Sequence, residues 1–287
     1  MILVAESGST KTEWRVSDGA FSSSLHTDGL NPLFGGTEGI VQEVSAWIDE
    51  VVRKENVDAF FFYGAGVLSA AATERLTDLF SPVLPCARME FASDLVAAAR
   101  ATCGDSAGIV AVLGTGTNSC FWNGRENELH TPALGYVLGD EGGGAYIGRR
   151  LLSDYLKGVM PRPVACRFEA KYGVTEAEAV RRVYAEPYPN RYLAGFARFA
   201  AENIAMPYVS ELVEEGFARF VKRNLHPYPT DSYPVNFVGS VAAAFTPQLE
   251  KVCRSCSVVT GKIIASPVEE LLEYHAGKAY GPTPAAR

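Results

Sequence analysis

Short apolar runs and amphipathic stretches alternate along the chain, and the period of each predicts an element. Residues 2–5 predict a buried strand, and the alternation that begins at Trp14 and Val16 predicts a second one. Between residues 37 and 54, apolar side chains recur on one helical face, with Thr37 as N-cap. The same patterns predict strands at 59–66, 88–91 and 257–260, after 108 and after 234, helices at 73–80, 95–102, 145–156 and 267–276, and a mostly helical region from 162 to about 225. This alternation indicates an α/β protein.

A polar turn separates the first two strands. It contains Gly8 and the hydroxyl residues Ser7, Ser9, Thr10 and Thr12. Such a turn exposes backbone N–H groups and short hydroxyls, which hydrogen-bond phosphate oxygens. Glu6, at the mouth of the turn, would repel a phosphate unless a divalent cation lies between them. We therefore expect residues 8–12, the first cradle, to bind nucleotide phosphates. We expect Glu6 to hold Mg²⁺ through a water molecule.

The same pattern recurs 107 residues later. Residues 108–119 repeat the apolar strand and the turn of Gly and hydroxyl residues, so that Thr117, Asn118 and Ser119 match residues 10–12. Two such cradles, the second at residues 114–119, would face one another across a cleft and hold phosphates from both sides. A third strand ends at Gly239 and Ser240, the third turn, against which a planar ring could lie.

Composition and charge narrow the function. The 287 residues are 47% hydrophobic and 21% charged, which favours a globular protein of two domains. A net charge of −7 argues against a nucleic-acid surface. No apolar run approaches the ~20 residues that span a bilayer, and Met1 leads into a strand rather than a signal segment. We expect a cytoplasmic protein with small-molecule partners and no membrane contact.

Cysteines and glycines add two local features. The six cysteines are scattered, mostly in apolar runs, as expected for reduced thiols, and the Cys253–Cys256 pair lacks a second pair or a nearby histidine to complete a metal site. A glycine-rich loop at residues 135–144 leads into a helix and carries Asp140 and Glu141. Helix capping alone would explain one of these acids.

Five motifs occur in a characteristic order: Glu6 to Thr12, Asp94, Gly114 to Ser119, Gly139 to Gly142 and Val238 to Val241. In this order the chain resembles the N-acetylglucosamine kinase branch of the sugar kinase, heat-shock 70 and actin superfamily, and the wider BadF/BadG/BcrA/BcrD ATPase group. The resemblance runs from about residue 1 to 275. It implies two ribonuclease-H-like (actin-like ATPase) domains, residues 1–106 and 107–287, hinged around an ATP cleft. The second would carry a helical insertion, and the last helix would pack back on the first.

The resemblance also implies roles for individual residues. The two cradles would hold the phosphates of ATP through Gly8, Ser9, Thr10, Lys11 and Thr12 and through Thr115, Gly116, Thr117 and Asn118, although the family varies at position 11. The third turn, Gly239 and Ser240, would lie by the adenosine. Asp94 would accept the proton of a sugar 6-hydroxyl. From the residues alone, Asp94 could equally be only a helix cap.

The acceptor side is matched in part. Asn31 and Asp140 correspond to the family's sugar-hydroxyl ligands, and Gly135 would line the same pocket. Asn31 could instead only form a turn before Pro32. Three neighbours, Ala133, Leu134 and Tyr136, stand where the animal-type kinases have Gly, Trp and His, so the wall could fit glucosamine, N-acetylmuramic acid or another sugar. We expect an ATP- and Mg²⁺-dependent kinase acting on an amino sugar, in the first place at O6 of N-acetylglucosamine.

Two other functions share part of the pattern. An ATPase that activates a 2-hydroxyacyl-CoA dehydratase needs cysteines that share an iron–sulfur cluster, whereas Cys253 and Cys256 lie on an expected helix. A sugar-responsive regulator usually carries a DNA-binding helix-turn-helix before the first cradle, whereas here the first strand starts at Ile2. Structural zinc is not expected, because the cysteine-rich motif of repressor-linked sugar kinases is missing. Family analogy suggests a homodimer, although no sequence feature marks an interface.

Overall fold

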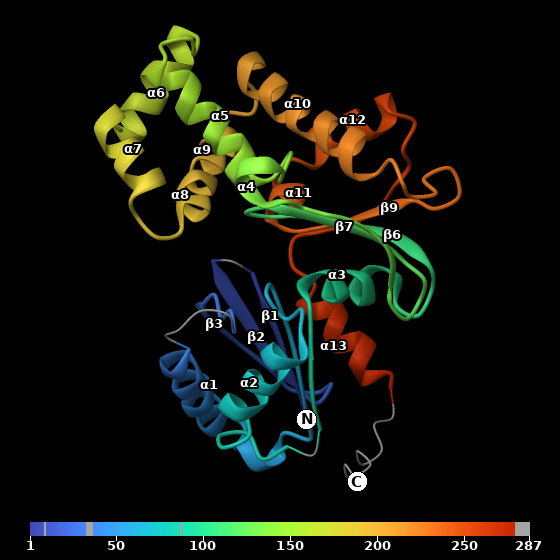
Figure 1. Cartoon of the computed structure of the whole chain (residues 1–287). Coiled ribbons are helices and arrows are strands. Elements are labelled where there is room, and N and C mark those ends of the chain that lie inside the picture. The colour runs from blue at the N-terminus through green and yellow to red at the C-terminus, as the bar shows by residue number, and fades with distance from the viewer. Residues whose placement is uncertain (9, 33–36, 87, 279–287) are drawn as a thin grey trace. The chain divides into compact units, whose positions relative to one another are not determined.

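The computed structural model describes residues 1–8, 10–32, 37–86 and 88–278, which divide into two compact units (Figure 1). The first unit contains Met1–Asp105 and the segment that begins at Ser266, and the second contains Ser106–Ala265. The division at 105/106 lies one residue from the expected boundary. Residues 266–278, which we assigned by number to the second domain, lie in the first unit.

The first unit is a five-stranded mixed sheet with helices on both faces. Its elements are β1 (Ile2–Ser7), β2 (Lys11–Ser17), β3 (Ser22–Asp28), α1 (Glu38–Val51), the 3-10 helix η1 (Lys54–Asn56), β4 (Ala59–Gly64), α2 (Ala70–Phe80), β5 (Arg88–Ala92), α3 (Asp94–Cys103) and α13 (Val268–Ala276). The strand order is β3-β2-β1-β4-β5, in which β1 is antiparallel to β2 and parallel to β4. Helix α13 contacts β1, β2 and α3.

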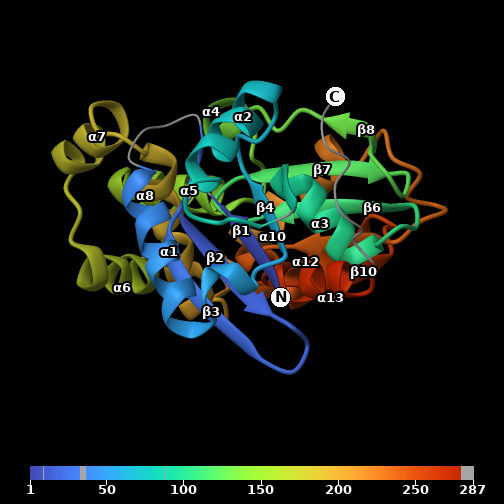
Figure 2. The same ribbon diagram turned by 90° about the horizontal axis from the view of Figure 1, so that it is seen from below.

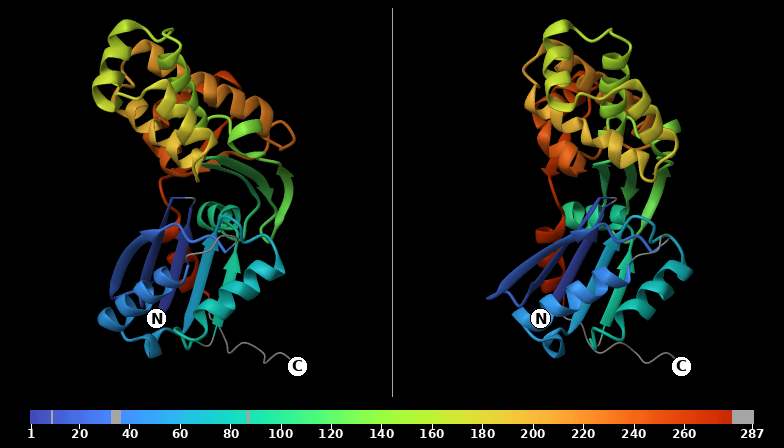
Figure 3. Two further views of the ribbon diagram at one scale, coloured as in Figure 1. Left: turned by 60° about the vertical axis from the view of Figure 1, so that its left-hand side comes forward. Right: turned by 90° about the vertical axis from the view of Figure 1, so that its left-hand side faces the viewer.

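Strand β4 is apolar along its whole length because both of its faces are covered. Phe60 and Phe62 point to one face, where they join a core with Trp14 and with side chains of α1 and α2. Phe61 and Tyr63 point to the other face and meet His275 of α13. Figure 3 shows α13, in red, across the blue strands from α1. A strand covered on both faces reads as a continuous apolar run, as the sequence pattern predicted.

The buried His275 makes the first unit sensitive to acid. Burial, aided by the nearby Arg100 guanidinium, lowers the pKa of its imidazole to about 3. Glu90 of β5 opposes this shift, whereas Lys278 and Arg88 add to it. Between about pH 6.5 and pH 3 the unfolded chain therefore binds a proton that the folded unit does not, so stability falls as pH falls through this window.

Below pH 6.5, we expect the free energy of unfolding to fall with pH more steeply for the wild type than for His275→Phe. The two slopes should differ by up to about 1.4 kcal/mol per pH unit. Urea unfolding at pH 4 to 7 measures this difference. The control is His226→Phe, which changes an exposed histidine. Parallel stability curves for the wild type and His275→Phe would contradict the assignment.

The second unit repeats the sheet of the first. Its elements are β6 (Gly108–Leu113), β7 (Thr117–Trp122), β8 (Asn127–Thr131), α4 (Gly135–Leu138), α5 (Gly144–Leu156), α6 (Arg162–Tyr172), α7 (Glu176–Tyr184), α8 (Pro189–Gly195), α9 (Ala197–Glu202), α10 (Pro207–Asn224), β9 (Val235–Val238), α11 (Ser240–Ala244), α12 (Thr246–Ser255) and β10 (Thr260–Ile264). The strand order is β10-β9-β6-β7-β8, which matches the first sheet read in reverse, and Figure 2 shows β6, β7 and β8 along this sheet. The predicted α/β class and the internal repeat are confirmed.

Some boundaries differ from the sequence prediction. The strand expected at 257–260 is β10, which starts only at Thr260, because Ser257 takes a left-handed backbone conformation (φ 59°) after α12. The predicted helical region is confirmed as α6 to α10, which lie between β8 and β9. Within the described ranges, no helix is long and apolar enough to cross a membrane.

Candidate active site

The first cradle is the tight turn between β1 and β2. The Gly8 N–H donates to the Lys11 carbonyl over 3.0 Å, and the Thr10 and Lys11 side chains are exposed. Among the described residues, a Cβ atom built on Gly8 would meet only the Lys11 oxygen, at an ordinary 3.8 Å. The fold itself therefore does not need glycine here, and the space beside Gly8 is open to a ligand. Ser9, a predicted phosphate ligand, lies outside the described residues.

Thr12 faces the interior instead. Its hydroxyl is fully buried, lies 2.8 Å from the Ser7 hydroxyl, donates to the Asp28 carbonyl and accepts the Leu30 N–H. The Ser7 hydroxyl also bonds the Leu30 backbone. These two hydroxyls fasten the loop that carries Asn31 to the cradle, so the side chain of Thr12 serves the structure of the site.

Asn31 lies against the glycine turn that follows β4. A Cβ atom on Gly66 would come within 2.5 Å of the Asn31 Oδ1 atom, and Gly66 has a φ of +92°. The Ala65 N–H bonds the Ser7 carbonyl at the end of β1. Asn31, the end of β1 and the turn after β4 are therefore neighbours, and Gly66 is required both by its conformation and by the approach of Asn31.

Glu6 and Asp94 form an acidic pair in the first unit. Glu6 ends the apolar part of β1, and Asp94 is the first residue of α3; both are half-buried. Ser93 is the N-cap, since its hydroxyl accepts the Val96 N–H, so capping does not account for Asp94. The Asp94 carboxylate accepts the N–H of the next residue over 2.9 Å.

Negative charge and burial outweigh the one positive charge that acts on Glu6. Burial raises the pKa of Glu6 to about 8, the Asp94 carboxylate adds to the shift, Glu13 adds less, and Lys11 opposes it. Burial also raises the pKa of Asp94. A buried carboxyl group that faces further acidic charge in this way suits a bound divalent cation.

The second cradle is built on the start of α5. Within the turn, the Gly114 N–H bonds the Gly116 carbonyl, and the first N–H groups of α5, from Gly144 and Ala145, bond the carbonyls of Gly114 and Thr115. Apart from its two chain neighbours, no atom of the described residues lies within 4 Å of a Cβ atom built on Gly114. The turn is thus held from behind by a helix while the side at Gly114 stays open.

Asp140 joins the glycine-rich loop to this cradle. It is 8% exposed, and its Oδ1 atom accepts the Thr117 N–H over 2.9 Å. A Cβ atom on Gly116 would stand 2.7 Å from the other oxygen, so glycine at 116 makes room for the carboxylate. Burial raises the pKa of Asp140, and the Thr117 N–H opposes the shift. The Thr117 hydroxyl is buried and has no hydrogen-bond partner among the described residues.

Sequence reasoning missed the partners of two neighbouring side chains. The Asn118 Oδ1 atom lies 2.9 Å from the His130 Nε2 atom on β8. Glu141 is buried and meets the Arg223 Nε atom of α10 at 2.6 Å. The second acid of the Asp140–Glu141 pair thereby ties the loop to α10, and only the tertiary fold brings these partners together.

The remaining predicted positions lie on exposed turns of the second unit. Gly135 begins α4 with a φ of +70°, beside Leu134, which is 60% exposed. A hollow next to them is lined by residues 131–134, 138, 139, 141, 223 and 224. Gly239 has a φ of +124°, and Ser240, which opens α11, is exposed.

The whole chain resembles solved proteins. The crystal structure of a candidate N-acetylglucosamine kinase from Porphyromonas gingivalis has a TM-score of 0.91 and 39% sequence identity, over 97% of this chain and 99% of that one. The chain belongs to the N-acetylglucosamine kinase-like family. Two more distant structures share the fold of this N-acetylglucosamine kinase-like chain: a candidate N-acetylglucosamine kinase from Chromobacterium violaceum (TM-score 0.70, 19% identity, 95% and 98% covered) and a ROK hexokinase from Thermus thermophilus (0.50, 15%, 95% and 97%). No family model and no curated protein matches the chain.

The cysteine pair of this N-acetylglucosamine kinase-like chain lies at the end of α12. Cys253 is buried and Cys256 is exposed, and burial raises the pKa of the Cys253 thiol to about 12. Across the described residues, no group of three or more His, Cys, Asp or Glu side chains is placed to hold a metal. Such a thiol is a poor nucleophile and a poor metal ligand at neutral pH.

Proposed function

We propose that this protein is an ATP- and Mg²⁺-dependent kinase that phosphorylates a hydroxyl of an amino sugar, with O6 of N-acetylglucosamine as the first candidate. The observation that carries the proposal is the Glu6–Asp94 pair: both side chains are half-buried, and burial together with the charge of Asp94 raises the pKa of Glu6. The identity of 39% with a candidate N-acetylglucosamine kinase over nearly the whole chain supports the same activity.

The residues present fit ATP and Mg²⁺. Open space lies beside Gly8 and Gly114, where phosphate oxygens could reach backbone N–H groups, and the unpartnered Thr117 hydroxyl could donate to a phosphate. Glu6 would hold Mg²⁺ through water, which agrees with the preference of this ion for one or two carboxylates and phosphates. When bound, Mg²⁺ would neutralise charge on the phosphates.

Asp94 would act as the base. As the sugar oxygen bonds to the γ-phosphorus and the bond to ADP breaks, its proton would pass to the Asp94 carboxylate. Burial raises the pKa of Asp94, which makes the ionised form a stronger base. Because the N–H of Leu95 holds one carboxylate oxygen, the other is available to the sugar. Asn31 and Asp140 would bind sugar hydroxyls.

The test is ADP release from ATP and Mg²⁺ with glucose, glucosamine, N-acetylglucosamine or N-acetylmuramic acid. We expect turnover that depends on an amino sugar, together with a sugar phosphate detected by mass spectrometry. ADP release that ignores every sugar would contradict the kinase and favour an ATPase. Comparing the rates with glucosamine and with N-acetylglucosamine tests whether the pocket wall at Ala133 and Leu134 accepts the N-acetyl group.

Glu6→Gln should weaken Mg²⁺ binding. The amide removes the charge that would hold the hydrated ion, so the Mg²⁺ concentration for half-maximal activity should rise about tenfold or more. Activity measured over a Mg²⁺ titration checks this. Glu43→Gln, which changes an exposed acid on α1, is the control and should follow the wild-type curve. If Glu6→Gln needs the same Mg²⁺ concentration as the wild type, Glu6 does not hold the metal ion.

Gly114→Ala should separate nucleotide binding from folding. The new methyl group meets no protein atom within 4 Å, so the melting temperature should stay near that of the wild type. It would occupy the space for a phosphate, and each lost charged hydrogen bond costs about 1.5–3 kcal/mol, so KM for ATP should rise at least about tenfold. Gly195→Ala, an exposed position with equally open space, is the control. An unchanged KM would place the phosphates elsewhere.

A further inference from the structure

Helix α3, which carries Asp94 at its first residue, has little apolar bulk to fix its position. Its fully buried side chains are mainly methyl groups, those of Ala97, Ala98 and Ala99. These three consecutive alanines point to different sides of the helix and pack closely, but they offer no large side chain that interlocks with a neighbour. Packing at these positions therefore resists sliding along the helix axis only weakly.

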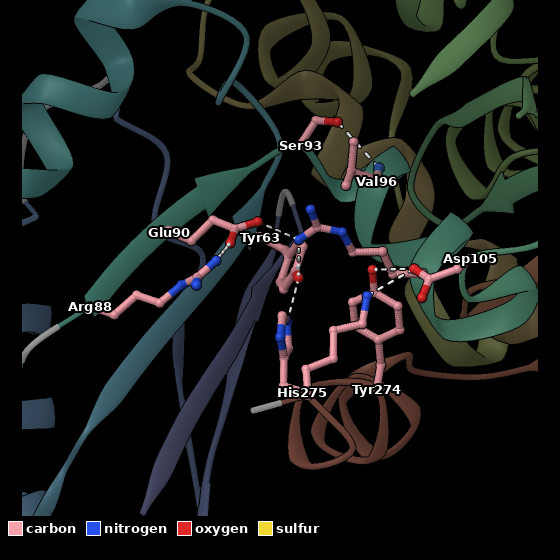
Figure 4. A network of polar contacts seen from close by, with 10 residues as sticks. Tyr63, Arg88, Glu90, Ser93, Val96, Asp105, Tyr274 and His275 are labelled. Carbon is pink, nitrogen blue, oxygen red and sulfur yellow. Dashed lines mark hydrogen bonds and ion pairs between the residues drawn. The ribbon is translucent and has the colours of Figure 1, made fainter. Parts of the chain in front are cut away.

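Polar contacts supply the missing constraint (Figure 4). The Arg100 NH1 atom of α3 donates to the Tyr63 hydroxyl of β4 over 2.8 Å and to the Glu90 carboxylate of β5 over 2.5 Å. Arg88 meets the same carboxylate at 2.9 Å. One side chain of α3 is thus bonded to two strands of the sheet on which the helix lies.

Tyr63 is itself held from a third element. Its hydroxyl lies 2.6 Å from the His275 Nε2 atom, and the His275 ring stacks on Phe61 at 3.5 Å between centroids. The hydroxyl accepts from Arg100 and also bonds the His275 Nε2 atom, with the direction of the second bond set by the tautomer of the imidazole. A neutral imidazole agrees with the lowered pKa of His275. The Tyr63 oxygen therefore has two nitrogen partners at fixed positions.

We propose that Tyr63 and Arg100 are positioning residues for Asp94, which set the place of the catalytic carboxylate by fixing α3 along its axis. This inference rests on the proposed function, in which Asp94 is the base. Arg100 lies six residues after Asp94, about 9 Å along a continuous helix. A shift of the guanidinium along the axis would move the carboxylate by the same amount, and a misplacement of about 1 Å can cost up to about 100-fold in rate.

The test is a double-mutant cycle on kcat for the best sugar. Tyr63→Phe removes only the hydroxyl, and we expect kcat to fall about tenfold while KM for ATP is unchanged. Asp94→Asn removes the base. If Tyr63 acts through Asp94, Tyr63→Phe should have little further effect on kcat in the Asp94→Asn background. Arg100→Lys, which keeps the charge but loses the planar fork, should resemble Tyr63→Phe.

Tyr274→Phe is the matched control. It makes the same chemical change on α13 and removes a hydrogen bond to Asp105, beyond the end of α3. We expect its kcat to equal that of the wild type. Thermal melting of each variant shows that the assays compare folded proteins.

The outcomes separate the two claims. If Asp94→Asn leaves kcat unchanged, the proposed base is wrong and the positioning role falls with it. If Asp94→Asn lowers kcat and the Tyr63→Phe factor is as large in that background as in the wild type, the base stands but the positioning role is wrong. A tenfold loss in Tyr274→Phe would also overturn the positioning role, since the effect would then be general to this side of the unit.

Discussion

We expect the replacement of Asp94 by asparagine to lower kcat for sugar phosphorylation by about 10²- to 10⁴-fold, the usual contribution of a general base. The amide oxygen can still accept the Leu95 N–H, and Ser93 still caps the helix, so α3 stays intact. The loss should therefore fall on kcat, with KM for ATP and the melting temperature close to those of the wild type. Coupled measurement of ADP release with the accepted sugar tests this.

Asp78→Asn provides the comparison, because it makes the same change at an exposed residue of α2. Its kinetics should match those of the wild type. A loss of less than about fivefold in Asp94→Asn would be too small for a general base. In that case the raised pKa of Asp94 would reflect burial without a role in proton transfer.

The largest effect on stability is expected at Gly239. Its φ of +124° is a conformation that other residues rarely adopt, and an added Cβ atom would strike the backbone carbonyl of Leu113, where the ends of β9 and β6 meet. Gly239→Ala should therefore destabilise the second unit by roughly 3 kcal/mol or more. Urea unfolding followed by circular dichroism measures the change.

Gly39→Ala on α1 gives the opposite expectation. Nothing lies within 4 Å of its new Cβ atom, and alanine favours the helix, so the free energy of unfolding should stay within about 1 kcal/mol of the wild type or rise. If Gly239→Ala is as stable as Gly39→Ala, the ends of β6 and β9 must be able to separate at little cost.

Local patterns predicted the elements that meet the core on one or both faces. The apolar run of β4 and the helical periodicity of α1 each follow from a physical period. The repeated strand-and-turn pattern also predicted the matching sheets, because duplicated sequence favours duplicated strand pairing.

The polar edge strands could not be found in this way. Strand β3 begins with three serines and has one buried side chain, Thr27, and β8 has no buried side chain. Both pair with only one neighbouring strand at the edge of a sheet, where burial does not select apolar side chains. Their position depends on backbone hydrogen bonds to β2 and β7, which leave little trace in the sequence.

For the candidate site, the sequence motifs named candidate positions but could not give the partners of those side chains. Three roles depend on contacts between distant segments. The Thr12 hydroxyl accepts the Leu30 N–H, Asp140 accepts the Thr117 N–H, and Arg223 pairs with Glu141. The anchor of α3 at Arg100 is of the same kind, since no motif connects it with β4 or β5.

The return of α13 to the first unit has a consequence for biosynthesis. During synthesis, the strands of the first sheet leave the ribosome early. Helix α13, which packs against the same face of this sheet as α3, leaves it only after the whole of Ser106–Ala265. Until then the β4 face that carries Phe61 lacks the ring of His275. The second unit can therefore complete its core while the first is unfinished, and a nascent chain arrested before residue 268 would expose apolar surface that chaperones recognise.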